Sequence, residues 1–520
     1  MQTRKRWDKW IVGYYTIDNF WQIFYDDQIF TGEFPQTYTN TLNKILEEQP
    51  KKSTPIVFIN NLKRTAVFFE GIELKETKVD SHQEQPMYAL YKNAEFRNLD
   101  VFCPDAISVA FEDEESPIVK VVNYLQTLGE IPSDVKYTLG HMVKKSIVSG
   151  IEDKITEFMK EHHLYFDSIE EYEDMRCGRK SGILWSESFG DIKENITQFD
   201  KSSAYSSIMV NDDKFPIGRL RRSEGQFGIV ALRETLKNDE WCKIVFEPDA
   251  VVPQQIECFR DEDTGLMALE YYDLIDLPVD IVQIAQNNID KFRFYRSQET
   301  GYLCKEFRDR LVEIYLQKQS LPKDDFYRAY AKAKLELVYG KGIQEHYFPS
   351  NKELRFYFRR AENFITPQIS MHCSAAVRYE LRSAYCENNI SYMDTDSIHG
   401  RQTEQFVKNV EKYNREIEEK NEIAGYPGLE IGVFKLEHAN SSELVLAYKQ
   451  RVVRCSDEVT FSIAGIPKKY IEDYIKNLTA DEKMKFFYDG KLYETPVMVF
   501  KFEKDAVYYN RTTLKNVILE

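Results

Sequence analysis

The chain has 520 residues, of which 42% are hydrophobic, and its formal net charge is −16. This length predicts two to four domains, and no stretch reaches the roughly 18 apolar residues that a transmembrane helix needs. The basic N-terminal residues lack a following apolar segment, so we expect a cytoplasmic protein without a secretory signal or membrane association.

Charge and cysteine patterns narrow the choice of ligands. The acidic balance argues against a uniformly basic surface for nucleic acid, but basic residues cluster at Arg219–Arg222, Arg355–Arg360 and Lys449–Arg454. Each cluster alone is most simply a solvated face, yet all three flank motifs described below. The eight cysteines are scattered without a CxxC pair, so no zinc site is expected.

The first third of the chain reads as strands followed by helices. β-rich segments at Ile11–Ile17 and Trp21–Tyr25 are separated by an Asp-Asn turn, and Ile56–Ile59 predicts a short buried strand. Helical patterns continue through Met159. The charged segment Glu170–Gly182 contains two glycines and is interpreted as a linker.

The remaining elements bring acidic residues to strand ends. Asn195–Phe199 predicts a strand that ends at Asp200. Helical periodicity over residues 305–339 breaks at Leu321-Pro322, which predicts a helical hairpin. Pro367–Tyr385 predicts a long helix with proline in its first turn, and Ile390–Met393 is a strand leading into Asp394.

Two carboxylates stand at alternate positions after that last strand. Asp394 and Asp396 would share one face of a strand, and such like charges are costly without a cation. A bare DxD is usually a surface turn, but here an apolar strand precedes it. Together with Asp200, the pair has the composition of a two-metal phosphoryl-transfer site for Mg²⁺ or, alternatively, Mn²⁺.

A basic helix supplies a third element. Arg328, Lys332, Glu336 and Tyr339 recur at three- or four-residue spacing, with Gly340 as a predicted C-cap. Lys332 is suited to hold a triphosphate as a point charge. The alternative is an ordinary amphipathic helix with a solvated charged stripe.

In this order the motifs resemble those of family B DNA polymerases, of the protein-primed type found in phages with linear genomes. Motif A (DxxSLYP) resembles Asp200–Ser206, motif B (KxxxNSxYG) resembles Lys332–Gly340, and motif C (YxDTDS) is complete at Tyr392–Ser397. The resemblance implies an α+β fold: a right-hand polymerase of palm, fingers and thumb behind an RNase H-like exonuclease-type domain. It also implies a DNA primer-template, deoxynucleotides and a terminal-protein primer as partners, in a host cytoplasm.

The resemblance further implies domain boundaries, which we expect in chain order. They are residues 1–180 (degenerate exonuclease-like domain), 181–215 (palm with motif A), 216–300 (terminal-protein-region insertion and palm), 301–342 (fingers), 343–363 (short second insertion), 364–440 (palm with motif C) and 441–520 (thumb).

Residue roles follow from the same resemblance. Asp200 and Asp396 would be the principal metal ligands, with Asp394 in support. Tyr205 would exclude a ribose 2′-hydroxyl.

Further family roles concern the nucleotide and the DNA. Lys332 and Lys318 would bind triphosphate, and Tyr339 would line the base-pair pocket. The DNA would be contacted by Ser374 and Arg378, which resemble a TxxAR segment, and by Lys449, which resembles the lysine of a KxY motif.

The chain departs from the family at several positions. Glu336 and Leu337 replace Asn-Ser in motif B, and Arg451 replaces the tyrosine of KxY. An acid near a triphosphate is unfavourable unless it pairs with Lys332 one turn away.

The exonuclease motifs are also altered. The HNLxFD motif has Thr65 in place of its metal-binding Asp, and a YxxxD motif has His141. The YxGG linker motif is reduced to Arg179–Gly182. DxE has no counterpart, and we expect that the chain begins after the strand that would carry it. We therefore expect no 3′–5′ exonuclease activity.

Two other functions remain open at this point. The acidic net charge and Glu336 suit a catalytically impaired, polymerase-like nucleic-acid-binding subunit, although the retained acids weigh against it. A palm polymerase that uses RNA as its template is the other alternative, which Tyr205 does not decide.

Overall fold

A computed structural model gives the structure of the protein. It describes residues 10–15, 20–25, 28–33, 36–48, 55–59, 73–80, 83–91, 94–98, 143, 146–178, 182–257, 259–261, 264–322, 325–340, 342–344, 346–384, 390–463, 471–472, 475–488, 493–503 and 506–517. These fall into two compact units, which are treated separately. The first comprises residues 1–143, 321–333 and 497–513, and the second, here called the main unit, comprises residues 144–320, 334–496 and 514–520.

The first unit contains a seven-stranded mixed sheet in the order β3-β2-β1-β4-β7-β6-β5. β1 and β7 each pair with β4 in parallel, and the other neighbours are antiparallel. The strands are β1 (Trp10–Tyr15), β2 (Phe20–Tyr25), β3 (Gln28–Glu33), β4 (Ile56–Ile59), β5 (Glu73–Asp80), β6 (Gln83–Tyr91) and β7 (Ala94–Asn98). The three predicted strands are therefore confirmed as β1, β2 and β4.

Helix α1 (Gln36–Glu47) closes the core of this sheet with its apolar side. Tyr38 and Leu42 are fully buried on it, and the Tyr38 ring meets Trp21 edge-on at 5.6 Å. Strands β21 (Tyr493–Glu503) and β22 (Ala506–Val517), of which residues 497–513 belong to this unit, pair as a separate two-stranded sheet.

A second seven-stranded sheet is the centre of the main unit. Its order, β20-β19-β18-β9-β17-β16-β8, joins segments far apart in the sequence. The strands are β8 (Leu184–Ser186), β9 (Ile192–Lys201), β16 (Ile390–Asp394), β17 (Ser397–Arg401), β18 (Phe434–Ala447), β19 (Gln450–Cys455) and β20 (Glu458–Ile463). The strands predicted before Asp200 and Asp394 are confirmed as β9 and β16.

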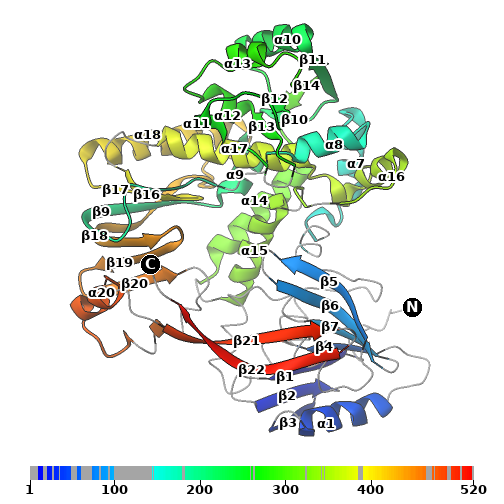
Figure 1. Ribbon diagram of the computed structural model, residues 1–520, viewed down its shortest axis with the longest axis vertical. Coiled ribbons are helices and arrows are strands. Elements are labelled where there is room, and N and C mark those ends of the chain that lie inside the picture. The colour runs from blue at the N-terminus through cyan, green and yellow to red at the C-terminus, as the bar shows by residue number, and fades with distance from the viewer. Residues whose placement is uncertain are drawn as a thin grey trace. The chain divides into compact units, whose positions relative to one another are not determined.

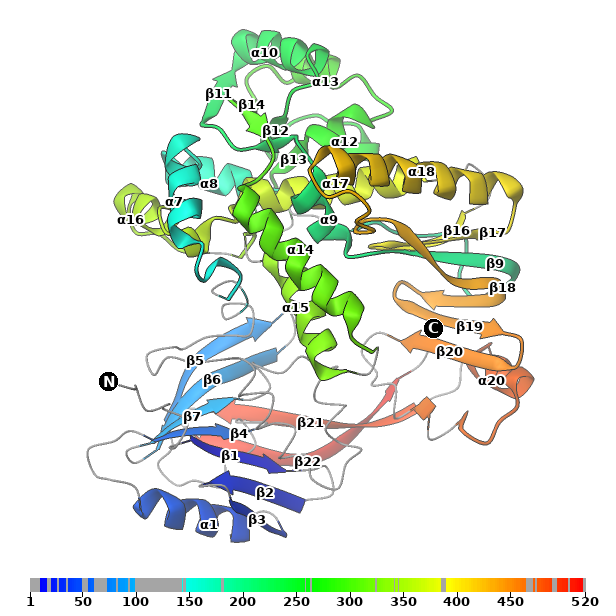
Figure 2. The same cartoon turned by 180° about the vertical axis from the view of Figure 1, so that it is seen from behind.

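Helices cover one face of this sheet. α9 (Ala204–Asn211), α17 (Pro367–Ser383) and α18 (Glu404–Ile423) pack together, and α17 and α18 run along the same side of β9, β16 and β17 in Figures 1 and 2. The ring of Phe199 on β9 meets Phe406 on α18 at 5.6 Å. At the far end of the sheet, α20 (Ala480–Tyr488) packs on β19 and β20.

Residues 216–300 form a subdomain with its own core. Its four-stranded sheet has the order β11-β14-β12-β13, and α10 (Gly225–Lys237) and α13 (Ile281–Asn287) pack around Leu232, Ile244 and Phe294, which are fully buried. The strands are β11 (Leu220–Glu224), β12 (Cys242–Phe246), β13 (Met267–Glu270) and β14 (Phe292–Ser297). Short elements complete it: β10 (Phe215–Pro216), β15 (Thr300–Gly301), α11 (Gln254–Glu257) and α12 (Tyr271–Ile275).

The predicted helical hairpin is confirmed as α14 (Lys305–Ser320) and α15 (Phe326–Gly340). Gly340 is the last residue of α15 itself. The predicted helix after Pro367 is α17, with the proline in its first turn. Between them lie α16 (Asn351–Phe358) and the 3-10 turn η2 (Ala361–Asn363), and α7 (Glu152–Glu161) packs on η2.

The linker expected at Glu170–Gly182 is wrong over its first half. Residues Ile169–Arg176 form helix α8, and the hydroxyl of Ser168 caps it by accepting a hydrogen bond from the Glu171 amide at 3.2 Å. Asp174 is 2% exposed and is bound by the Arg293 guanidinium of β14 through Nε at 2.6 Å. The charges that suggested a solvated linker are therefore partly internal ion pairs and capping groups.

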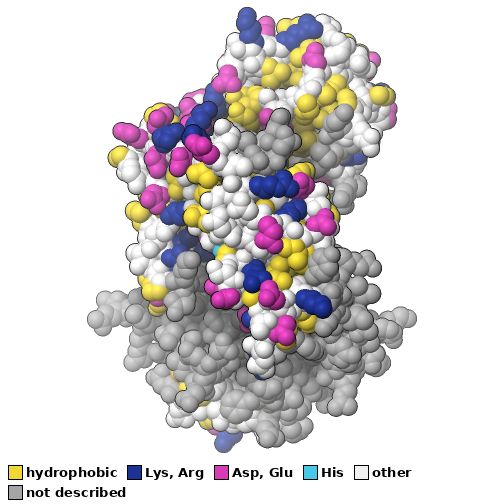
Figure 3. Space-filling model, turned by 90° about the vertical axis from the view of Figure 1, so that its left-hand side faces the viewer, with side chains coloured by type: hydrophobic (Ala, Val, Ile, Leu, Met, Phe, Trp, Pro, Cys, Tyr) yellow, Lys and Arg dark blue, Asp and Glu magenta, His cyan; other side chains and the backbone are white. Residues whose placement is uncertain are grey.

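Acidic and basic side chains are interspersed on the described part of the face in Figure 3, rather than separated into two large patches. The net charge therefore says little about any single surface. No helix among the described residues combines the length and the apolar character needed to cross a bilayer.

A buried imidazole joins the 216–300 subdomain to the central helices. His372 on α17 donates from Nδ1 to Glu270 at 2.6 Å and from Nε2 to Asp212 at 2.9 Å. The Trp241 indole also donates to Glu270, and the Tyr272 hydroxyl donates to Asp212. Burial by itself would lower the pKa of His372, but the two carboxylates outweigh it and raise the pKa to about 9.

This raised pKa predicts a loss of stability in mild alkali. The contribution of His372 is fully present below its unfolded pKa near 6.5 and is lost as the pH rises through about 9. The free energy of unfolding should fall by on the order of 3 kcal/mol over that window, by the linkage of one pKa unit to 1.36 kcal/mol. In thermal unfolding from pH 6 to 9, His372→Gln should be less stable at pH 6 and show a flatter profile. His438→Gln is the control; a His372→Gln profile parallel to that of the wild type would contradict the assignment.

Candidate active site

The pairing of β9 with β17 brings the three predicted acids into one neighbourhood. Asp200 lies directly opposite Ser397, the residue that follows Asp396. The amide of Lys201 donates to the carbonyl oxygen of Asp396 at 2.7 Å. Residues almost two hundred positions apart are therefore adjacent in the sheet.

The register also assigns the acids to a face. Cross-strand partners in an antiparallel pair point to the same side of a sheet, and successive residues alternate. Asp200 pairs with Ser397, and Ser397 pairs with Asp394, so both carboxylates lie on one side. Phe199 points the other way, to α18, which identifies the opposite side as the acid-bearing face.

The turn that carries Asp396 is tightly constrained. Thr395 and Asp396 connect β16 to β17 as a two-residue hairpin, and Thr395 has a φ of 57°. The Thr395 amide donates to the carbonyl of Ile183 at 2.8 Å. A Cβ at Gly182 would lie 2.5 Å from the Thr395 Cα, so only glycine allows this approach. Gly182, the last residue of the reduced YxGG segment, thus supports the hairpin.

Asp394 is held by its neighbours in the hairpin. Its Oδ2 accepts from the Tyr392 hydroxyl at 3.2 Å and its Oδ1 from the Thr395 hydroxyl at 3.0 Å. The Tyr392 oxygen in turn accepts from the backbone amide of Lys449 at 3.0 Å. Burial raises the pKa of Tyr392 to about 12, so it remains a hydroxyl donor.

Lys449 lies at the exposed turn between β18 and β19, with a φ of 62°. Through the Tyr392 hydroxyl, this turn is one hydrogen-bonded step from Asp394. The structure therefore places the predicted DNA-contacting lysine beside the predicted metal-binding hairpin.

Tyr205 and Tyr339 form a stacked pair. Their ring centroids are 3.7 Å apart with 9° between the planes, and the Ser206 hydroxyl donates to the Leu335 carbonyl at 2.7 Å. Burial and the neighbouring Tyr339 raise the pKa of the Tyr205 hydroxyl well above its usual range. The end of α15 is thus fixed on the helix that follows Asp200.

The predicted triphosphate-binding lysines differ in their surroundings. Lys318 on α14 donates from Nζ to the Ser203 hydroxyl at 2.9 Å, in the turn just after Asp200. Lys332 is exposed on α15, one turn before the exposed Glu336. Lys318 therefore lies beside the motif A turn, three residues after Asp200.

A buried ion pair lies behind Asp200 and has no counterpart in the sequence analysis. The ammonium of Lys201, on the helix-covered face, pairs with Glu380 of α17. Glu380 also accepts from the Tyr413 hydroxyl at 3.0 Å and from Lys420 at 3.2 Å. A single lysine after a strand-end aspartate gave no signal of this network, because its partners come from two distant helices.

The predicted TxxAR residues are internal in this structure. Ser374 is 2% exposed and donates to the Ser370 carbonyl at 3.2 Å. Arg378 is 4% exposed and binds Asp273 of α12 through Nη2 at 2.9 and 2.8 Å. The Arg378 contact joins α17 to the 216–300 subdomain, and a contact of either residue with DNA stays a prediction. Thr65 and His141 lie outside the described residues.

The three carboxylates are hard oxygen donors of the type that Mg²⁺ and Mn²⁺ prefer. In the part of the chain that the structure describes, no three His, Cys, Asp or Glu side chains already converge as metal ligands. The three acids lie on adjacent strands or their connecting turn, and the Asp394 carboxylate is hydrogen-bonded to Tyr392 and Thr395 of its own hairpin.

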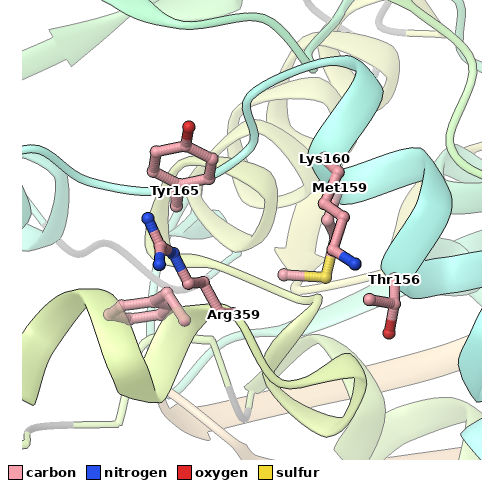
Figure 4. Close-up of a pocket in the computed structure, with 6 residues that line it drawn as sticks. Thr156, Met159, Lys160, Tyr165 and Arg359 are labelled. Atoms are coloured by element: carbon pink, nitrogen blue, oxygen red, sulfur yellow. The ribbon is translucent and has the colours of Figure 1, made fainter.

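One pocket of the main unit lies elsewhere, between α7 and α16, with a volume of about 170 Å³. Figure 4 shows Met159 and Lys160 on one side of it and Tyr165 with Arg359 on the other. The Arg359 guanidinium lies 5.6 Å from the centre of the Tyr165 ring. None of the predicted site residues lines this pocket.

Comparison with solved structures shows the fold. The chain matches Phi29 DNA polymerase in complex with primer-template DNA and incoming nucleotides with a TM-score of 0.58, 14% identity, and coverage of 99% of this chain and 100% of that one. A second Phi29 DNA polymerase structure, in an orthorhombic crystal form, gives 0.57 and 14% over 89% and 94%. No protein-family model and no curated protein matches the sequence. The predicted α+β class is confirmed.

The contact between Gly182 and Thr395 yields a direct test of the hairpin. Gly182→Ala should lower the free energy of unfolding by about 1–3 kcal/mol, because its methyl group must displace backbone rather than a flexible side chain. Gly340→Ala adds the same group in open space and should be neutral or stabilising. The stabilities of the two variants are compared by urea denaturation. Equal midpoints would show that the hairpin accommodates the added methyl group without loss of stability.

Proposed function

We propose that the protein is a DNA-directed DNA polymerase that adds deoxynucleotides by two-metal phosphoryl transfer. The observation that carries this proposal is the β9–β17 register, which sets Asp200 beside the Asp394–Asp396 hairpin on one sheet face. The likeness to Phi29 DNA polymerase over nearly the whole chain supports it. A primer-extension assay separates this function from that of a non-catalytic binding subunit, and DNA and RNA templates compared side by side address the template.

Asp200, Asp394 and Asp396 would hold two Mg²⁺ ions, or Mn²⁺, which when bound would neutralise triphosphate charge and lower the pKa of the primer hydroxyl. The donor set fits such ions, because all three side chains are carboxylates on adjacent strands or their connecting turn. Without a cation, three carboxylates on adjacent strands and their connecting turn would be an unfavourable concentration of like charge.

The chain's own residues position the reactants. Lys318, held at the Ser203 hydroxyl, offers an ammonium to the triphosphate next to Asp200. The Tyr205 ring, fixed by stacking on Tyr339, would bar a ribose 2′-hydroxyl. Lys449, on the turn tied to Tyr392, would bind the primer strand. Lys332 would be a second triphosphate ligand.

We assign the parts of a right-hand polymerase to the observed elements. The central sheet with α9, α17 and α18 would be the palm, α14 and α15 the fingers, and residues 441–520 the thumb. β19 and β20 are continuous with the central sheet, so the thumb would begin as an extension of the palm. The 216–300 subdomain would bind a terminal protein that supplies the priming hydroxyl.

The first unit would be an RNase H-like domain without exonuclease chemistry. Its strand order places β1 in the sheet interior, between β2 and β4, where the DxE motif would stand. That strand reads Trp10-Ile-Val-Gly-Tyr-Tyr15 and contains no acid. In this proposal β1 would be the DxE strand without its carboxylates, in place of the expectation that the chain begins after that strand.

The polymerase proposal predicts the behaviour of two acids. Asp200→Asn and Asp396→Asn should each lower primer extension by at least about a hundredfold, because each removes a charge from the proposed metal ligands. Binding of primer-template DNA, measured by fluorescence anisotropy, should stay within about threefold of the wild type, since phosphate contacts from basic residues dominate affinity.

The matched control is Asp457→Asn, at an exposed aspartate in the turn between β19 and β20. It should extend primers like the wild type. Normal extension by Asp200→Asn or Asp396→Asn would reject the site, and an inactive wild type with every metal and template would reject the function.

The exonuclease proposal is tested separately. Purified protein with Mg²⁺ or Mn²⁺ should leave 5′-labelled single-stranded DNA intact, because a two-metal nuclease needs acids that β1 lacks. The Asp396→Asn variant serves as the background control for the polymerase site. Metal-dependent shortening from the 3′ end that persists in this variant would restore an active exonuclease.

A further inference from the structure

Three polar side chains form a connected network on the acid-bearing face. His399 of β17 donates from Nδ1 to Glu443 of β18 at 2.5 Å, and Arg451 of β19 donates from Nη1 to His399 Nε2 at 2.5 Å. His399 and Glu443 are both fully buried. Because Nε2 accepts a hydrogen bond, the imidazole is neutral, and the two formal charges belong to Glu443 and Arg451.

The network touches the hairpin of Asp394 at two points. His399 is the cross-strand partner of Tyr392, and their rings meet edge-on at 5.2 Å. His399 Nε2 also lies 3.3 Å from the Ser397 hydroxyl, which donates to the Asp394 carbonyl at 3.2 Å. His399 therefore contacts Tyr392 and Ser397, two of the three hairpin residues that hydrogen-bond Asp394.

Glu443 also binds the strand that leads to Asp394. Its Oε2 accepts from the Ser391 hydroxyl at 3.2 Å, next to Tyr392. The four strands β16, β17, β18 and β19 are thereby joined through one carboxylate and one imidazole.

Stability alone is a weak reason for such an arrangement. Desolvating two charges often costs as much as their attraction returns, and apolar residues of similar volume can be equally stable. What a satisfied buried network does provide is a fixed geometry, since each partner has one orientation that meets all its hydrogen bonds.

The network also accounts for a departure from the family motif. Arg451 stands where the KxY pattern has a tyrosine, and a guanidinium brought against a buried imidazole requires a counter-charge. Glu443 supplies that charge across the ring of His399.

We propose that His399, held between Glu443 and Arg451, is a positioning residue that fixes the Tyr392–Ser397 hairpin in the conformation with which Asp394 and Asp396 hold a divalent metal ion. This inference rests on the proposed function for the role of the two aspartates. It assigns the network to metal affinity rather than to DNA binding or to folding.

The test measures metal binding without DNA or nucleotide. Mn²⁺ affinity is obtained from the electron paramagnetic resonance signal of free Mn²⁺ during titration, and the Mg²⁺ concentration for half-maximal primer extension is measured in parallel. His399→Leu should weaken Mn²⁺ binding by about tenfold and raise the Mg²⁺ requirement by a similar factor, as expected for a residue that orients metal ligands. His399→Asn retains one donor and one acceptor and should restore both values to within about threefold of the wild type.

Two further variants separate positioning from folding. The triple variant Glu443→Met, His399→Leu and Arg451→Met removes all charge and should fold even if His399→Leu does not, yet bind Mn²⁺ as weakly as predicted. Arg454→Met removes an arginine from the same strand, at an ion pair with Asp481, and should bind Mn²⁺ normally.

Wild-type Mn²⁺ affinity in the folded triple variant, or in folded His399→Leu, would overturn the inference, and so would a wild type that binds no Mn²⁺. Weakened Mn²⁺ binding in these variants would support it even if no form of the protein extends a primer. In that case the proposed polymerase function would fail while the positioning role stood.

Discussion

The register between β9 and β17 is the constraint on which the site depends. A shift of one residue would turn Asp200 to the face covered by α17 and α18, because side chains alternate with a period of two. Phe199 packs on Phe406 on that covered face, so apolar burial selects the register that keeps Asp200 on the other. The same hydrophobic contact that stabilises the sheet thus decides where the charge lies.

Charged networks on both faces then fix the details that apolar packing leaves free. Lys201 and Glu380 pair on the covered face, directly behind Asp200, while His399 joins Glu443 and Arg451 on the acid-bearing face. Buried ion pairs contribute little net stability, but removing one partner of such a pair is costly. They therefore suit a function in which geometry matters more than stability.

The sequence sufficed for what is encoded locally. The sequence predicted the strands from their alternation and two helices from the break at Leu321-Pro322, and the structure confirms these elements. The Tyr392–Ser397 motif identified the neighbouring acids. The sequence did not reveal that Glu171 and Asp174 belong to a helix. A capping hydrogen bond to Ser168 and an ion pair with Arg293 of β14 stabilise this charged segment as a packed helix, and the arginine partner is not evident from the local sequence. Nor did it reveal that Arg378 meets Asp273, a partner more than a hundred positions away.

The hydroxyl of Tyr392 connects the turn that carries Lys449 to the hairpin that carries Asp394 and Asp396. It accepts from the Lys449 amide on the turn between β18 and β19 and donates to Asp394 on the hairpin between β16 and β17. A movement of either turn must therefore alter the other or break a partly buried hydrogen bond, which costs about 1–3 kcal/mol. Arg451 lies two residues after Lys449 and binds His399, the cross-strand partner of Tyr392. Arg451, which stands at the tyrosine position of the KxY motif that the sequence resembles, therefore lies where hydrogen bonds join the Lys449 turn to the acid-bearing hairpin. The network around His399 and this hairpin thus form one structural unit.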